Sequence, residues 1–132
     1  MTITKTINIA CSAGKAFAFI ANPSNWALYA IHNVKSIKQD DHGDWLMETP
    51  RGNGKLVIHP NKDLGILDHD FIDAREGLWT VPTRIVATPS GCHLMMTFSK
   101  PEQLTPSMFE EGMKLLNEEL LELKKLLEEK QY

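Results

Sequence analysis

Residues 9–26 read IACSAGKAFAFIANPSNW, and this stretch opens with the signals of a short helix. Ser12 is a suitable N-cap, because its side-chain oxygen can accept a hydrogen bond from the first helical turn. Phe17 and Ile20 follow at helical spacing among alanines, which gives the segment one apolar face. The pattern predicts a helix over residues 13–21 that buries this face against another part of the chain.

The end of the same stretch predicts a second short helix directly after the first. Asn22 is a favourable N-cap and Pro23 a favourable first helical residue, so this helix should cover residues 23–30. Trp26 and Tyr29 are three residues apart and therefore lie on one side of it. Both helices are too short to be stable alone, so they must pack on a larger element.

The sequence on either side of these helices has the pattern of strands. Isoleucines among threonines predict a first strand over residues 3–9, although Lys5 interrupts the alternation. Downstream, five turn sequences such as the one at 41–43 separate six short runs, which hairpins would join into an antiparallel meander. These six predicted strands cover residues 34–40, 44–49, 54–59, 64–73, 77–88 and 91–100.

One proline lies inside the predicted strand over residues 77–88. Pro82 has no backbone N–H to donate to a neighbouring strand, so it implies an edge, a bulge or a bend. A bend at this point would disturb the inward direction expected for Thr83 and Ile85.

The chain closes with a long amphipathic helix. Thr105 is the expected N-cap and Pro106 the first helical residue, and the helix should run to about Lys130. Charged residues occupy most of its surface, and one narrow stripe is apolar. That stripe, which must lie on the sheet, consists of Phe109, Met113, Leu116, Leu120, Leu123 and Leu127.

This order of elements is an α+β layout in which a curved sheet wraps around the last helix. Together with the stretch from Ile9 to Pro23 and the following Trp26, it resembles the START-like, or SRPBCC, superfamily, which includes Bet v 1 and polyketide cyclase/dehydrase-like proteins. The resemblance covers the whole chain. It implies one domain over residues 1–132 with a helix-grip fold: a seven-stranded curved antiparallel sheet, two short helices after the first strand, and a long C-terminal helix.

The resemblance also implies a deep, mostly apolar cavity between the sheet and the last helix. It does not select a function, because the superfamily includes lipid carriers, binders of hormones and secondary metabolites, aromatase/cyclases and chaperone activators. No catalytic motif of the superfamily comes with the match, so no catalytic residue can be carried over.

Composition limits the class of protein. With 132 residues, 42% of them hydrophobic, the chain is long enough for one globular core and short for two. The formal charge is -3, which disfavours nucleic acid and anionic lipid surfaces as partners.

Cysteine usage and hydropathy favour an intracellular location. Cys11 and Cys92 are far apart with no CxxC motif, so both are interpreted as reduced core thiols. In residues 1–5, apolar and polar side chains alternate, whereas a signal peptide has an unbroken apolar run. No apolar stretch of the sequence is long enough to span a membrane. We therefore expect a cytoplasmic protein without membrane insertion.

Alternation along the strands predicts which side chains face the cavity. We place the bulkier apolar set of alternating residues on the inside. Phe71 then lies opposite Trp79, and His69 lies opposite both Val81 and Leu56, on neighbouring strands. The predicted lining, including residues from both helical regions, is Trp26, Tyr29, Trp45, Met47, Leu67, His69, Phe71, Trp79, Val81, Thr83, Met96, Phe98, Phe109, Gly112, Met113 and Leu116.

Each part of this lining has a purely structural alternative. Large apolar residues at these spacings also describe a filled core. Gly112 could leave room for a ligand or merely let helix and sheet approach closely. His69 could contact a ligand or act as an acid or base, or be a buried imidazole bonded to the backbone. Tyr29 could offer its hydroxyl to a ligand or lie half exposed at the entrance.

Other chemistry has little support in the sequence. The remaining histidines, His32, His42, His59 and His93, lack metal-ligand spacing, and no nucleotide-binding or nucleophile motif occurs. We therefore expect neither a metal nor a cofactor.

Three functions remain open. The first is binding of a small lipophilic molecule, aromatic or polyketide-like, in the cavity. The second is a polyketide cyclase/dehydratase-type enzyme with His69 as general acid or base. The third is a protein-interaction or chaperone-activator module with a collapsed interior. A second apolar flank of the last helix, formed by Met108, Leu115 and Leu126, could serve a homodimer or another partner.

Overall fold

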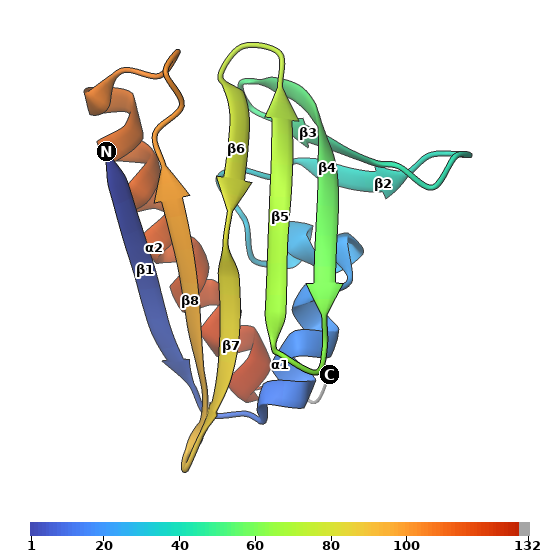
Figure 1. Ribbon diagram of the computed structural model, residues 1–132, viewed down its shortest axis with the longest axis vertical. Helices are drawn as coiled ribbons and strands as arrows, with labels where there is room; N and C mark the ends of the chain where they lie inside the picture. The colour runs from blue at the N-terminus through green and yellow to red at the C-terminus, as the bar shows by residue number, and fades with distance from the viewer. Residues whose placement is uncertain (130–132) are drawn as a thin grey trace.

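The computed structural model describes residues 1–129 as a curved antiparallel sheet wrapped around one long helix (Figure 1). The end expected for this helix, near Lys130, lies outside the described residues. In chain order the elements are β1 (Thr2–Ile9), α1 (Ala13–Ile20), the 3₁₀ helix η1 (Pro23–Leu28), β2 (Ser36–Gln39), β3 (Trp45–Thr49), β4 (Gly52–Asn61), β5 (Ile66–Asp73), β6 (Gly77–Val81), β7 (Thr83–Thr88), β8 (Gly91–Ser99) and α2 (Pro106–Glu129).

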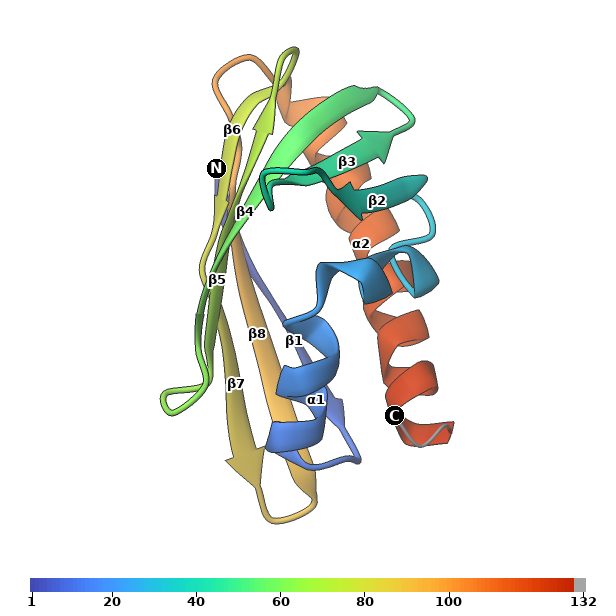
Figure 2. The same ribbon diagram turned by 90° about the vertical axis from the view of Figure 1, so that its right-hand side faces the viewer.

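The sheet is a single antiparallel layer in the order β1-β8-β7-β5-β4-β3-β2, with β6 also paired to β5. Figure 2 shows it from the side: α2 runs along its concave face, and β2 and β3 curve toward that helix. The sheet does not close, because β1 and β2 are its two ends. This architecture confirms the predicted helix-grip fold.

The N-caps expected from the sequence are present at all three helices. The side-chain oxygens of Ser12, Asn22 and Thr105 each accept a hydrogen bond from a backbone N–H two or three residues further on. The second helix differs from the prediction in type and length, since it is a 3₁₀ helix that ends at Leu28 rather than at Ala30. With Pro23 at its start and only six residues, it is typical of the short 3₁₀ connections between larger elements.

Pro82 divides the strand expected over residues 77–88 into two. β6 pairs with β5, whereas β7 pairs with β8 and meets β5 only at one position. Pro82 still accepts a hydrogen bond at its carbonyl from the N–H of Thr97, at 2.9 Å. The alternation survives the break, because Val81, Thr83 and Ile85 are all buried. The irregularity expected at Pro82 is therefore real, but it leaves the inward direction of the next residues intact.

One predicted alignment is wrong by two residues. Leu56 opposes Phe71, and His69 opposes Ile58, where Leu56 and His69 were expected to be partners. The cause is the loop between β4 and β5. β4 extends to Asn61, and the turn closes at Gly65, which has a positive φ of 65° and accepts a hydrogen bond from the Ile85 N–H at 2.8 Å. The two other expected pairs, His69 with Val81 and Phe71 with Trp79, are confirmed.

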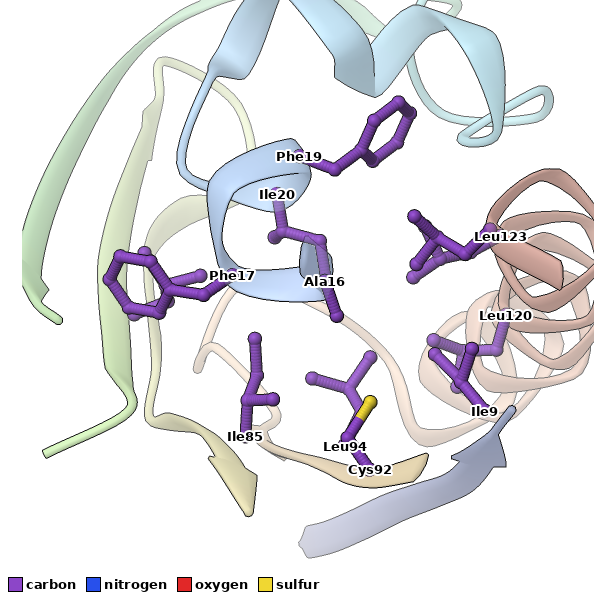
Figure 3. Close-up of a cluster of buried hydrophobic side chains, with 12 residues drawn as sticks. Ile9, Ala16, Phe17, Phe19, Ile20, Ile85, Cys92, Leu94, Leu120 and Leu123 are labelled. Atoms are coloured by element: carbon purple, nitrogen blue, oxygen red, sulfur yellow. The ribbon is translucent and has the colours of Figure 1, made fainter. Parts of the chain in front are cut away.

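The largest buried cluster joins α1 to the sheet and to the C-terminal half of α2 (Figure 3). Phe17 and Ile20 of α1 point into it, as the helical spacing predicted. Its buried members are Ile9, Ala16, Phe17, Phe19, Ile20, Leu67, Ile85, Cys92, Leu94, Leu120, Leu123 and Leu127. Two smaller clusters lie further along the sheet, one around Trp26 and Met47 and one around Phe98 and Phe109. The core therefore fills one end of the space between sheet and helix more fully than the other.

The two cysteines should be poor nucleophiles in the folded protein. Both are free; Cys92 lies in the core as expected, whereas Cys11 is only half-buried at its edge. Burial raises the pKa of Cys11 and raises that of Cys92 to about 11. At about pH 8 we expect slow reaction of both thiols with iodoacetamide in the native state and rapid reaction after unfolding in guanidinium chloride. Mass spectrometry of timed samples measures this difference; equal rates in the two states would contradict the predicted burial.

Candidate functional site

A pocket of about 190 Å³ lies between the concave face of the sheet and α2. Its walls come from Ile20 of α1, from η1 and the loop after it, from strands β3 to β8, from Leu104, and from the N-terminal three quarters of α2. Most of the lining side chains are apolar, and they belong to the edges of all three buried clusters. The pocket is thus the space that these clusters leave unfilled.

The structure brings all but two of the predicted lining residues to this pocket. Those that line it are Trp26, Tyr29, Met47, His69, Phe71, Trp79, Val81, Thr83, Met96, Phe98, Phe109, Gly112, Met113 and Leu116. Leu67 lies instead in the cluster around α1, and Trp45 packs against the cluster around Trp26. The role of these residues as ligand contacts stays a prediction.

Gly112 faces open space. A Cβ atom added at this position would meet no atom of the described chain within 4 Å, apart from its immediate helix neighbours. Close approach of helix and sheet therefore does not explain this glycine. Gly112 lines the pocket, so its missing side chain leaves pocket space open; the use of that space by a ligand stays a prediction.

His69 is the most deeply placed titratable side chain in the apolar part of the pocket, with 7% of its surface exposed. Its ring stands edge-to-face against Trp26, with 4.9 Å between the ring centroids and 67° between the planes. The indole of Trp26 is itself held by a hydrogen bond from Nε1 to the Ile20 carbonyl, at 2.8 Å. The imidazole is therefore packed against a ring that is fixed in place.

One nitrogen of His69 is engaged by the backbone. Nδ1 lies 3.1 Å from the carbonyl oxygen of Leu67, two residues earlier in β5. A carbonyl oxygen can only accept, so Nδ1 must carry the proton and Nε2 must be bare in the neutral ring. Burial lowers the pKa of His69, and this effect exceeds the opposing influence of the Leu67 hydrogen bond and of the Asp68 and Asp70 carboxylates.

The lowered pKa of His69 predicts a specific loss of stability in acid. Below about pH 6.5 the unfolded chain binds a proton at this position that the folded chain resists, so folding stability falls as pH falls. His69→Gln has no such titration. Denaturant unfolding at about pH 7.5 and about pH 5.5 should show a larger drop for the wild type than for this variant. Equal drops would contradict the burial of an unprotonated imidazole.

Tyr29 is the second polar group at the apolar wall. Burial, with a smaller contribution from the Glu119 carboxylate, raises the pKa of its hydroxyl well above the usual value, so the group is a neutral phenol at every ordinary pH. Its ring lies 6.2 Å from that of Phe19, at an interplanar angle of 40°. The side chain retains some exposed surface, which is expected where a ring borders a pocket.

A group of polar residues also lines the pocket, and most of its members were not predicted from the sequence. Glu119 on α2 is only 3% exposed and accepts three hydrogen bonds from the loop after η1. Its Oε2 accepts hydrogen bonds from the backbone N–H groups of His32 and Asn33, at 2.9 and 3.0 Å. Its Oε1 accepts one from the Asn33 side-chain amide at 2.7 Å. This carboxylate therefore ties the loop to α2.

The same network continues across two hairpins. Arg51, in the turn between β3 and β4, donates from Nη2 to Asn33 Oδ1 at 3.3 Å, and its Nε forms an ion pair with Glu76 Oε1 at 2.5 Å. Glu76, in the turn before β6, accepts a hydrogen bond from Trp79 Nε1 at 3.0 Å. We call Asn33, Arg51, Glu76, Trp79 and Glu119 the polar belt. It connects α2, the loop after η1 and two hairpins, and all its members line the pocket.

Strand alternation predicted Trp79 as a lining residue, and one other member of the polar belt had a signal in the sequence. Glu119 follows Gly112 by seven residues and Leu116 by three, so helical spacing puts it beside the apolar stripe of α2. Asn33, Arg51 and Glu76 lie in turns, where no periodicity indicates the direction of a side chain.

The described residues contain no group of three or more histidine, cysteine, aspartate or glutamate side chains that could hold a metal ion. Of the three residues predicted to form an outer flank of α2, Met108 is 49% exposed and also lines the pocket, whereas Leu115 and Leu126 are half-buried. A homodimer through this flank stays a prediction.

Comparison with solved structures identifies the fold. A protein from Bacillus thuringiensis superposes with a TM-score of 0.77 at 11% sequence identity, covering 96% of this chain and 98% of its own. A START superfamily protein from Mycobacterium smegmatis has a TM-score of 0.67 at 12% identity, covering 90% and 93% of the two chains. Ara h 8.0201, of the Bet v 1 family, has a TM-score of 0.70 at 10% identity, covering 96% and 97%. The protein has a START-like fold.

The START-like assignment rests on structure rather than on sequence. No protein-family model matches the chain, and no curated protein matches it. At 10 to 12% identity the neighbours establish the fold and no function. Within residues 1–129 of this START-like chain, no helix is long and apolar enough to cross a membrane.

Proposed function

We propose that the protein binds a small, uncharged, mostly apolar molecule in the pocket between the sheet and α2. The observation that carries this proposal is the pocket itself: mostly apolar side chains line about 190 Å³ of unfilled space between the sheet and α2. Protein interiors normally leave few voids larger than a water molecule, because each void forfeits packing contacts. An apolar pocket of this size is therefore a favourable place for an apolar ligand.

The size of the pocket limits the ligand. An apolar cavity of about 150 Å³ suffices for benzene, whereas pockets for larger organic ligands usually measure roughly 300–1,000 Å³. A volume near 190 Å³ favours a molecule with one or two rings, or an aliphatic molecule of similar size. Of the two ligand classes expected from the sequence, a small aromatic compound fits better than a folded polyketide chain.

The two alternative functions have weaker support. An enzyme using His69 as a base must stabilise an imidazolium, but Nδ1 faces a neutral carbonyl rather than a carboxylate. The interaction module requires a collapsed interior, and the unfilled pocket argues against it. If the enzyme alternative is right, His69→Gln will abolish turnover of a reactive polyketone while the fold persists.

Mass spectrometry and titration test the proposal. Protein purified from its native host is compared under native and denaturing conditions, and a small apolar compound should be released on denaturation. Purified protein is then titrated with naphthalene while tryptophan fluorescence is followed, because Trp26 and Trp79 both line the pocket. We expect saturable binding to one site. The absence of both a released compound and saturable binding would contradict the proposal.

A further inference from the structure

Three polar features of the pocket bear on the chemistry of its ligand: the bare nitrogen of His69, the hydroxyl of Tyr29 and the polar belt. The polar belt is already engaged, because its carboxylates and its guanidinium have partners within it; Glu76 Oε1 accepts no hydrogen bond but is ion-paired with Arg51 Nε. The His69 nitrogen is different. No hydrogen bond joins Nε2 to any residue in the described part of the chain, although the ring lines the pocket.

From this geometry we infer that the ligand carries a hydroxyl group, and that this hydroxyl donates a hydrogen bond to Nε2 of His69. The inference rests on the proposed function and specifies the ligand class of the same pocket. A bare imidazole nitrogen can only accept, so its partner must be a donor. Nε2 is not fully buried, since Glu76 Oε1 is the one fully buried side-chain N or O atom without a hydrogen bond in the described residues, so a ligand hydroxyl in the pocket can reach and donate to it.

The surroundings of His69 keep this nitrogen an acceptor. The Leu67 carbonyl holds the proton on Nδ1, and burial lowers the pKa of the ring, so the charged form with two donors is disfavoured. The neighbouring carboxylates are engaged elsewhere: Asp68 accepts the Thr83 N–H at 2.8 Å, and Asp70 pairs with Thr80 and His59 on the outer face. The acceptor role is thus set by backbone geometry and burial together.

Charge along the pocket wall excludes an acidic ligand. Four charged side chains line the pocket: the Arg51 guanidinium and the carboxylates of Asp73, Glu76 and Glu119. Arg51 is already paired with Glu76, so no free cation is left to balance a ligand carboxylate among the described residues. Bringing an anion into this apolar space next to three carboxylates would be strongly unfavourable. The ligand is therefore a neutral hydroxy compound, such as a phenol or a small alcohol.

The test compares 2-naphthol, naphthalene and 2-naphthoate in titrations of the wild type, His69→Phe and His59→Phe. His59 lies on the outer face, 57% exposed at its side chain, and provides a matched control. Because any change of pocket shape affects both neutral probes, the ratio of their affinities isolates the hydrogen bond. We expect the affinity for 2-naphthol, divided by the affinity for naphthalene, to fall about fivefold in His69→Phe and to stay constant in His59→Phe. We also expect no binding of 2-naphthoate.

A second measurement needs no variant. In the ¹⁵N NMR spectrum of the wild type, the Nε2 signal of His69 should have the shift of a bare nitrogen and move on addition of 2-naphthol but not of naphthalene. Naphthalene binding with an unchanged affinity ratio and an unmoved Nε2 signal would overturn the inference and leave the proposed function standing. Tighter binding of 2-naphthoate than of 2-naphthol would also overturn it. No binding of either neutral probe would overturn both.

Discussion

Glu119→Ala is expected to destabilise the protein by about 2–5 kcal/mol, the largest single effect on stability that the site predicts. The substitution leaves three donors without their acceptor: the backbone N–H groups of His32 and Asn33 and the Asn33 side-chain amide. The carboxylate is 3% exposed, so water cannot easily take its place. Denaturant unfolding followed by circular dichroism measures the loss.

The neighbouring residue provides the control. Glu118 is 61% exposed at its side chain and makes an ion pair with His32 at 2.8 Å on the surface. Glu118→Ala removes the same charge from the same helix and should cost no more than about 1 kcal/mol. If the two alanine variants are equally stable, the loop after η1 does not depend on the buried carboxylate and the polar belt does not hold the pocket together.

Gly112→Leu is expected to abolish binding of naphthalene while making the protein more stable. The new side chain points into open space in the pocket, so it fills volume that the probe needs. Replacing glycine inside a helix also adds about 0.5–1 kcal/mol of helix propensity. A variant that gains stability and loses binding separates the two roles of this position. Calorimetric titration and thermal unfolding of the same sample measure both effects.

Gly14→Leu is the matched control for this experiment. Gly14 lies in α1, and a Cβ atom there also meets no atom within 4 Å, but the residue is exposed and does not line the pocket. It should gain helix propensity without any change in naphthalene affinity. Wild-type affinity in Gly112→Leu would mean that the probe binds somewhere other than the space between the sheet and α2.

Most of the fold is predictable because its elements are strongly periodic. The apolar stripe of α2 and the alternation of Val81, Thr83 and Ile85 fix which faces are buried, and alternation survives even the break at Pro82. Register is harder to predict. The pairing of β4 with β5 depends on where the chain turns, and the turn is set by the contact of Gly65 with Ile85, two residues far apart in the sequence.

The sequence predicts the apolar lining of the pocket better than the polar belt, because only the apolar lining follows regular repeats. Strand parity and helical spacing indicate the apolar lining residue by residue, because both are regular repeats. Arg51 and Glu76 meet only because two hairpin turns come together in the folded chain. No local pattern contains that information, so the polar belt becomes visible only in three dimensions.

The most direct test of ligand binding in this pocket is a crystal structure of the protein with 2-bromonaphthalene, located by the anomalous scattering of its bromine. We predict one strong bromine peak between the sheet and α2, within contact distance of Trp26 and Met113, with the polar belt in place. A structure in which side chains fill this space, or in which bromine is found only on the outer surface, would contradict the account.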